Sequence, residues 1–335
     1  MPEPLRPPRR EDLRREGSAP RAAHGQLLDR ATVLRPTRWA RDAAAGGPAG
    51  TALCDGRRSL EQVAELAGLA PAPALELLSA LYAQGLLAET GEAPIPPLLF
   101  LDHARSLCLR LRRELLAARS GLEATLAAGA YSRRLAVGYL VEVTHVIAGA
   151  ASHISAAIAL AGDPATQRLL CEYLEDEHWH GAWMERALAA AGLDEGTRAV
   201  ALPLSATQAV LDSWRRAARA DLLLYGGLIA ITESGPEDAS HVEALFRRTV
   251  AQGVLPEAAW RPCFEHAFGD SGADHLALSR SLVADAWGLP ARRRDGLRRS
   301  LLLHTEAVVG MEHAILDFYA AAEGPPVHAL EWAAG

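Results

Sequence analysis

The chain has 335 residues, of which 50% are apolar, so it is long enough for two or three domains with a large core. Its net charge of −7 is mild and gives no reason to expect a nucleic-acid partner. The four cysteines lie far apart without a CxxC pair, which excludes a disulfide framework and a thiolate zinc site. Aromatic residues make up only 5% of the chain, a composition that favours helix over sheet.

Residues 1–25 are polar, Pro-rich and mixed in charge, and they predict a disordered arm. They contain no apolar region of the kind found in a secretory signal. The stretch Leu135–Gly162 is long enough to span a bilayer, but it carries Glu142, His145 and His153. A buried core helix is the better interpretation, so we expect a cytoplasmic protein with no membrane partner.

Residues 26–92 predict a small α+β unit of the winged-helix type. Asp55-Gly56 indicates a turn, and Ser59 is the expected N-cap of a short helix. Pro71 begins a second helix, which ends before the sequence Gly85-Leu86-Leu87. The order turn, helix, Pro-turn, helix and terminal GLL is typical of a winged helix.

A winged helix can bind DNA, but residues 1–92 contain 12 Arg and 12 acidic residues. The positive surface of a DNA-binding domain is therefore missing. The line LCDGRRSLEQVAELAGLAPAPALELLSALYAQGLL, from Leu53 to Leu87, resembles PqqD-like peptide-recognition domains. The resemblance implies that the leader of a precursor peptide pairs as an added strand on the small sheet. A purely structural appendage is the alternative.

Residues 93–98 are expected to form a Pro-rich linker, residues 99–323 a helical domain and residues 324–335 a tail. No strand-like alternation follows Pro97. Apolar periodicity predicts helices over about 99–127, 131–162, 164–192, 205–233, 237–253, 257–268, 273–287 and 292–322. The predicted fold class is mainly α, with a small N-terminal α+β winged-helix domain.

Carboxylates and imidazoles recur on the apolar faces of these helices. Glu142 is the only charged side chain, histidines aside, between Leu135 and Gly162, and Glu177 and His180 share one helix face. Buried carboxylates are costly unless they are paired or bound to metal, and helical proteins build two-metal sites from such inward-pointing groups.

Three further residues follow the same pattern. Glu233 ends an uncharged run, and His266 and Asp270 are four residues apart on one face. Some of these residues also have an alternative explanation. Glu142 could form a salt bridge to an Arg, Glu233 could be a solvated residue at a helix end, and Asp270 could be a turn residue. The pair Glu175 and His178 has the same spacing as Glu177 and His180 but more polar neighbours, so the latter pair is preferred.

The order and spacing of these residues resemble the haem-oxygenase-like di-metal oxidases and oxygenases, with TenA-like and PqqC-like proteins as relatives of the same fold. The similarity spans about residues 99–290 and includes LVEVTHVIAGAASHISAAIALAGDPATQRLLCEYLEDEHWHGAWMERALAAAGL, LLYGGLIAITE and FEHAFGDSGADHLALSRSLV. It implies a haem-oxygenase-like helical bundle whose metal ligands are Glu142, Glu177, His180, Glu233, His266, Asp270 and His275.

The last motif of the family is His-x-x-x-Asp-x-x-His, and this sequence departs from it. After His266 and Asp270, the next histidine is His275 and not residue 273. In an ideal helix His275 would point away from His266, so the prediction needs a break near Gly269 and Gly272. Glu306 and His313, seven residues apart on the last helix, are the reserve candidates.

The resemblance implies two Fe(II) ions, with Mn(II) as a rival, and O2 as co-substrate. Together with the peptide-recognition unit, it predicts a non-haem di-iron oxidase or oxygenase that tailors a ribosomally made precursor peptide. The alternatives are a non-catalytic partner that presents the peptide, and a di-iron oxidase of a free amino acid or other small molecule. A ferritin-like bundle fits less well because its final Glu-x-x-His motif is absent. The oligomeric state stays open, with a homodimer common in this fold.

Overall fold

The computed structural model describes residues 27–29, 31–38, 40, 54–129, 131–232, 239–272, 275–284, 288–321 and 323–329, with only the backbone for 239–241 and 267–272. The predicted arm at 1–25 lies outside these residues.

The N-terminal unit contains two short strands and two helices. Strand β1 (Leu34–Pro36) pairs antiparallel with β2 (Leu87–Glu89), and the chain between them forms α3 (Leu60–Leu66) and α4 (Pro71–Ala83). The predicted N-cap is present: the Ser59 side chain accepts from the backbone of Gln62, whose side chain accepts from the Ser59 backbone. Among the described residues, a small N-terminal strand pair therefore accompanies a mainly helical structure.

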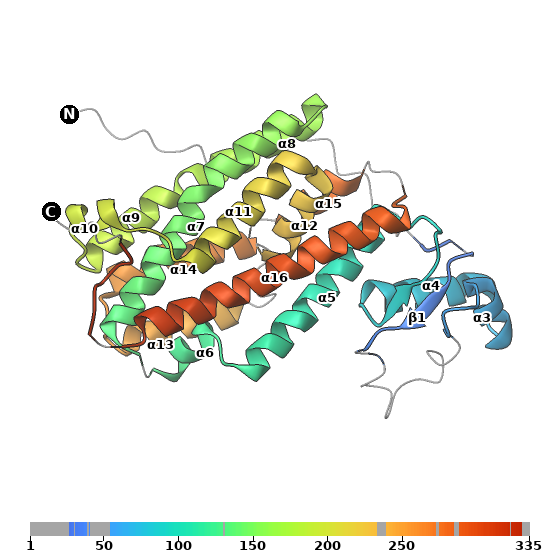
Figure 1. The fold of residues 1–335 in the computed structure, drawn as a ribbon, viewed down its shortest axis with the longest axis horizontal. Coiled ribbons are helices and arrows are strands. Elements are labelled where there is room, and N and C mark those ends of the chain that lie inside the picture. The colour runs from blue at the N-terminus through green and yellow to red at the C-terminus, as the bar shows by residue number, and fades with distance from the viewer. Residues whose placement is uncertain are drawn as a thin grey trace.

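The rest of the described chain is a bundle of helices (Figure 1). They are α5 (Pro97–Ala118), α6 (Leu122–Ala128), α7 (Arg133–Leu160), α8 (Pro164–His178), α9 (His180–Ala190), α10 (Glu195–Val200), α11 (Ser205–Ala220), α12 (Leu222–Thr232), α13 (Ala239–Ala251), α14 (Glu257–Gly272), α15 (His275–Ala284) and α16 (Ala291–Tyr319). The predicted class, mainly α with a small N-terminal α+β part, is confirmed.

Three of the predicted helices are divided in two by short breaks, between α5 and α6, at Trp179 and at Asp221. Asp221 adopts extended backbone angles, and its carboxylate accepts from the N–H of Leu223, 2.9 Å away. The aspartate therefore caps α12. Periodicity did not reveal the break because the apolar pattern continues on both sides of it.

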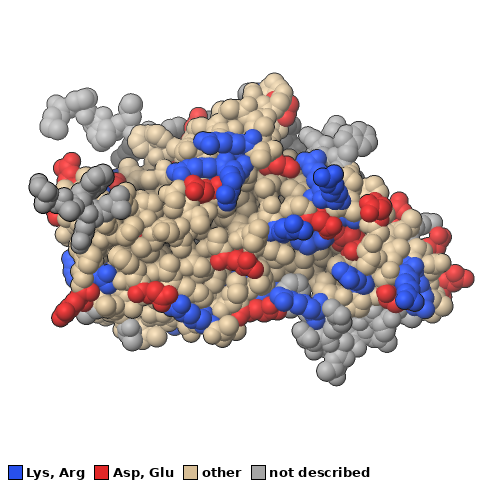
Figure 2. Space-filling view, viewed as in Figure 1, with Lys and Arg blue, Asp and Glu red and all other residues tan. Residues whose placement is uncertain are grey.

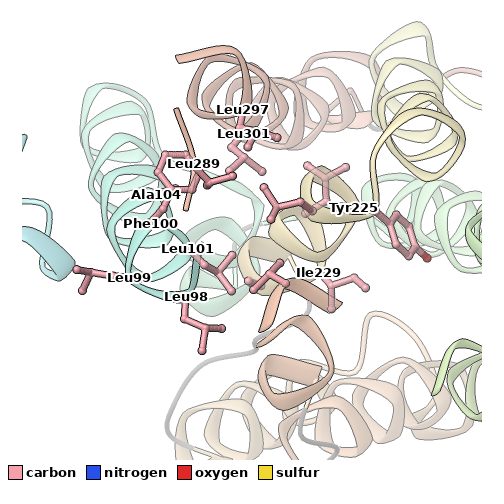
Figure 3. Close-up of a cluster of buried hydrophobic side chains, with 14 of the residues drawn as sticks. Leu98, Leu99, Phe100, Leu101, Ala104, Tyr225, Ile229, Leu289, Leu297 and Leu301 are labelled. Carbon is pink, nitrogen blue, oxygen red and sulfur yellow. The ribbon is translucent and has the colours of Figure 1, made fainter. Parts of the chain in front are cut away.

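The N-terminal unit and the helical bundle share one hydrophobic cluster. It includes Tyr82 and Leu87 of the N-terminal unit together with leucines of α5 and α16. Figure 3 shows where α5, α12 and α16 meet, with Leu101, Ile229 and Leu301 among the labelled side chains. A second cluster lies around Trp260 of α14. The predicted division into domains stays a prediction, since one core crosses the proposed boundary.

The segment predicted to be a linker packs against the bundle. Ile95 is fully buried and forms an isolated antiparallel bridge with Leu289, with N···O distances of 3.2 and 2.8 Å. Helix α5 then begins at Pro97, a favoured residue for a first helical turn.

Helix α7 is the one described helix long and apolar enough, by length and composition alone, to cross a membrane. It packs instead against α8, α9, α11 and α16 (Figure 1) and buries Glu142 and His153 among them. These contacts are those of a core helix.

Charged side chains on the surface pair across helices. Arg112 of α5 contacts Glu312 of α16 at 3.0 Å, and Arg119 contacts Asp317. On the face shown in Figure 2, arginines are interspersed with acidic side chains. Exposed ion pairs of this kind contribute little to stability.

We expect Gly138→Ala to destabilise the protein. A Cβ at Gly138 would clash with the ring of Tyr319, which is fully buried, so the ring must move. Overpacking of a core costs about 1–3 kcal/mol. The control is Gly296→Ala in α16, where a Cβ meets nothing within 4 Å and helix propensity favours Ala by about 1 kcal/mol. Urea unfolding measures the free energy of unfolding of both variants. Equal values for the two variants would contradict the close contact between Gly138 and Tyr319.

Candidate metal site

Glu177 lies in the last turn of α8, and its side chain is only 6% exposed. The predicted continuous helix bends at Trp179, so that α8 ends at His178 and α9 begins at His180. The bend keeps the predicted pair together: Nδ1 of His180 donates to Oε2 of Glu177 over 2.9 Å.

Two further imidazoles approach the same carboxylate. Nε2 of His266, on α14, lies 3.8 Å from Oε2 of Glu177, and Nε2 of His275, on α15, lies 4.0 Å from Oε1. The rings of His180 and His266 meet edge to face with centroids 4.4 Å apart. One buried carboxylate is thus surrounded by imidazoles from three other helices.

The break required for His275 falls between α14 and α15. Helix α14 runs through Gly269 to Gly272, and α15 begins at His275 itself. His275, at the start of α15, lies near Glu177, although its spacing from His266 differs from that of the family motif. Whether His275 binds metal stays a prediction.

The donor set fits a divalent transition metal. Glu177, His180 and His266 each offer one ligand atom, and the three atoms lie within 4.8 Å of one another. A mixture of carboxylate oxygen and imidazole nitrogen suits Fe(II) and Mn(II). The described residues therefore bring together ligands for one cation.

The electrostatics of the site favour an ionised carboxylate. Burial by itself raises the pKa of Glu177, but hydrogen bonds from His180 and His266, and their positive charge when protonated, outweigh burial and lower that pKa to about 2. A carboxylate that is charged at neutral pH and surrounded by imidazoles is suited to hold a cation.

Glu142 has other partners in the structure. It is fully buried, and it accepts from the N–H of Leu204 at 3.0 Å, from the hydroxyl of Thr207 and from the hydroxyl of Tyr319 at 3.2 Å. Leu204 is the N-cap of α11 and has no capping side chain of its own, so Glu142 serves as the cap. It is not part of the Glu177 cluster, and its role as a metal ligand stays a prediction.

The other candidates are placed as follows. Glu233 lies outside the described residues, and for Asp270 the structure describes only the backbone, within α14. Glu306 is exposed, and His313 contacts the carbonyl of Arg119 at 3.2 Å. Neither belongs to the cluster of Glu177, His180 and His266.

The competing pair Glu175 and His178 is exposed, whereas Glu177 is buried. The preference for Glu177 and His180, which rested on their apolar neighbours, therefore agrees with the observed burial.

A layer of buried rings lies close to the cluster. Nδ1 of His153 hydrogen-bonds to the hydroxyl of Tyr225 at 2.9 Å, and its ring stacks on Trp214 with centroids 4.8 Å apart. His153 also interacts electrostatically with Glu177. His304 also contacts Trp214, with ring centroids 5.5 Å apart, and it was not among the predicted site residues. Its position seven residues after the buried Leu297 was the available signal.

Two solved structures resemble this chain over about two thirds of its length. A domain of unknown function with a haem-oxygenase-like fold, from Shewanella denitrificans, matches with a TM-score of 0.54 and 12% identity, over 67% of this chain and 96% of that chain. A TenA homologue from Pseudomonas syringae pv. tomato matches with a TM-score of 0.49 and 10% identity, over 65% of this chain and 93% of that chain. No family model and no curated protein matches the sequence. The match to the Shewanella denitrificans domain gives this chain a haem-oxygenase-like helical fold, and an identity of 12% shows the fold alone.

We expect Glu177→Gln and His180→Gln each to weaken Fe(II) or Mn(II) binding by more than ~100-fold, because each removes one of three converging ligands. The matched controls are Glu175→Gln and His178→Gln, which change the same residue types on the exposed side of α8. Anaerobic titration with metal analysis measures the affinities. Equal losses of metal affinity in the variants of Glu177 and His180 and in the control variants would contradict the site. Circular dichroism checks that each variant is folded.

We also expect the free energy of unfolding of the metal-free protein to fall as the pH is lowered from about 6.5 to about 4. Burial lowers the pKa of His103, His153 and His304 to about 4 each. These histidines take up protons near pH 6.5 in the unfolded chain, so the unfolded chain binds more protons than the folded chain across this window. Each histidine lowers the free energy of unfolding by roughly 3 kcal/mol once it is protonated in both states.

Urea unfolding of the metal-free protein at several pH values between 7.5 and 4.5 measures this slope. His304→Gln should reduce it by roughly a third, whereas His178→Gln, an exposed control, should leave it unchanged. A slope that His304→Gln does not alter would contradict the assignment.

Proposed function

We propose that this protein is a metal-dependent oxidase or oxygenase that uses O2 to modify a ribosomally made precursor peptide. The observation that carries the proposal is the buried carboxylate of Glu177 with imidazoles of three other helices around it. The candidate ligand atoms of Glu177, His180 and His266 lie within 4.8 Å of one another. The haem-oxygenase-like fold is compatible with this class of enzyme. The same fold also includes proteins with other activities.

In this proposal Glu177, His180 and His266 hold Fe(II), with His275 beside them. Such an ion, when bound with open positions, supplies the redox chemistry with O2. The residues themselves fix the position of the ion and supply one negative charge. The ring layer of His153, Trp214 and Tyr225 provides a water-poor wall on one side.

A second ion, as expected from the resemblance, would require Glu142, Glu233 or Asp270. Glu142 can serve only if its carboxylate gives up the hydrogen bonds from Leu204 and Thr207. The bound stoichiometry therefore distinguishes a one-metal centre from a two-metal centre.

The peptide part of the proposal rests on the N-terminal unit. Among the described residues β2 pairs only with β1, so its other edge has no strand partner, and an extended peptide can add there. On α4 the apolar residues Pro73, Leu77 and Ala80 share one exposed stripe, with Leu77 52% exposed. An exposed apolar stripe of this kind suits apolar side chains of a bound strand.

Two measurements test the proposal. Protein loaded anaerobically with Fe(II) should consume O2, and Glu177→Gln should abolish this uptake. Calorimetry with the synthetic leader of a candidate precursor, encoded beside this protein, should show binding that depends weakly on salt. Leu77→Glu should remove that binding, whereas Leu303→Glu, at an equally exposed leucine of α16, should not.

Absence of O2 uptake by iron-loaded protein would overturn the enzymatic part. Duplex DNA binding that weakens steeply with salt, without peptide binding, would overturn the peptide part. Iron binding with O2 uptake but no peptide binding would favour an oxidase of a small molecule.

A further inference from the structure

A cavity of about 350 Å³ lies where α7 begins. Its walls come from the first residues of α7, from the segment that joins α9 to α10, and from the chain that follows α16. Figure 1 shows the chain after α16 turning back toward α9 and α10. Among the described residues, neither the Glu177 cluster nor the N-terminal unit contributes to the lining, so the cavity is separate from the site described above.

Two arginines line this cavity without a counterion. Within the described part of the chain, neither Arg133 nor Arg134 forms an ion pair with a carboxylate. They are the first two residues of α7, a helix of 28 residues with no acidic side chain in its first turn. Positive charge is disfavoured at this end of a helix, because the N-terminal backbone N–H groups already carry partial positive charge. The cavity therefore has a positive potential that attracts an anion.

Neutral carbonyl groups hold both guanidinium groups in place. Nη2 of Arg133 donates to the carbonyl of Ala191 at the end of α9. Arg134 donates from Nε to the carbonyl of Pro325 at 2.9 Å and from Nη1 to that of Ala321 at 3.2 Å. These bonds fix the two side chains but bring no negative charge. The remaining N–H groups of both guanidinium groups are left for a ligand, and a guanidinium fork matches the two oxygens of a carboxylate.

The backbone passes close to both guanidinium groups at glycines. Gly192 has a φ of +85°, and a Cβ there would come 2.9 Å from Nη2 of Arg133. Gly324 has a φ of +122°, and a Cβ there would come 3.1 Å from Cζ of Arg134. Only glycine combines this backbone conformation with so close an approach. The walls of the cavity are therefore shaped around the two arginines.

The lining also contains one acidic residue, Asp194. Its carboxylate accepts from the hydroxyl of Thr197 at 2.7 Å and from the N–H of the same residue at 2.9 Å. These hydrogen bonds lower the pKa of Asp194, so it is charged at neutral pH. Two bonds leave lone pairs on the carboxylate, which can accept from a donor group of a ligand.

The remaining walls include apolar side chains. Val137, Leu193 and Pro326 form what we call the apolar wall of the cavity. Val137 and Leu193 are buried, so they extend the core of the bundle to this surface. The ligand that matches the cavity thus has an anionic group, a hydrogen-bond donor and an apolar body.

We propose that this cavity binds an N-acylated α-amino acid, either free or as the C-terminal residue of a peptide. Arg133 and Arg134 bind its carboxylate, the adjacent amide N–H donates to Asp194, and its side chain packs on the apolar wall. Two arginines and one aspartate carry one net positive charge, which a single carboxylate neutralises. A phosphate group carries more negative charge and would place the excess beside Asp194. The site uses no metal ligand, so it does not depend on the proposed function.

Calorimetry on the metal-free full chain tests the site with N-acetyl-leucine as the probe. We expect binding at millimolar concentrations, and binding of N-acetyl-leucinamide, which lacks the charge, should be weaker by more than ~10-fold. Inorganic phosphate should bind more weakly than N-acetyl-leucine. A tripeptide that ends in leucine distinguishes the two sources of the ligand. Binding at least as tight as that of N-acetyl-leucine identifies a peptide C-terminus, and weaker binding identifies a free acid.

Substitutions locate the binding. Arg133→Gln and Arg134→Gln should each weaken the binding of N-acetyl-leucine by ~10-fold or more. The matched control is Arg292→Gln, at an exposed arginine in the first turn of α16 that does not line the cavity, and it should leave the binding unchanged. Circular dichroism checks the fold. Arg133 is exposed and makes one hydrogen bond, so its variant remains informative if Arg134→Gln unfolds the chain.

Three results would overturn the proposal. The first is the absence of N-acetyl-leucine binding at millimolar concentrations, and the second is equal binding of the acid and its amide or tighter binding of phosphate. The third is unchanged binding in Arg133→Gln. None of these measurements involves metal or O2, so their failure would leave the proposed function untouched.

Discussion

Burial of carboxylates is the constraint on which this structure depends most. A buried charge costs several kcal/mol unless it is compensated, and Glu89, Glu142 and Glu177 are each compensated by groups far away in the sequence. Glu89 joins β2 to α16, Glu142 joins α7 to α11 and α16, and Glu177 joins α8 to α9, α14 and α15. The arrangement of the helices follows from these compensations together with the apolar clusters.

The three carboxylates differ in how they are compensated, and this difference separates a candidate metal ligand from structural groups. Glu89 faces two guanidinium groups, which stay charged at any physiological pH. Glu142 accepts from a backbone N–H and two hydroxyl groups, so the fold satisfies it without a cation. Glu177 faces imidazoles, which can bind a metal through a ring nitrogen when they are neutral. A cation is therefore the natural partner for Glu177 alone among the three.

The seam between the N-terminal unit and the bundle changes how the two parts work together. A shared hydrophobic cluster and the hydrogen bonds of Arg294 make residues 93–96 part of the packed structure. In the proposed function, recruitment of a peptide through such a unit would act by geometry as well as by raising the local concentration of the peptide. The proposed reaction would then depend on the spacing of residues in its substrate as well as on their chemistry.

The sequence by itself determined the helical class, the order of the N-terminal elements and the pairing of Glu177 with His180, because these depend on local periodicity, caps and i, i+3 spacing. Only the tertiary structure decided the bends at Trp179 and Asp221, where the apolar pattern continues across the break. It also decided that Glu142 caps α11 and that His275 reaches Glu177. The buried contacts of Glu89 with Arg294 and Arg298 could not be predicted, because Glu89 lies far from both arginines in the chain and each residue is unremarkable alone. Burial and pairing of polar groups are properties of contacts between distant segments, and local pattern contains no information on which segments meet.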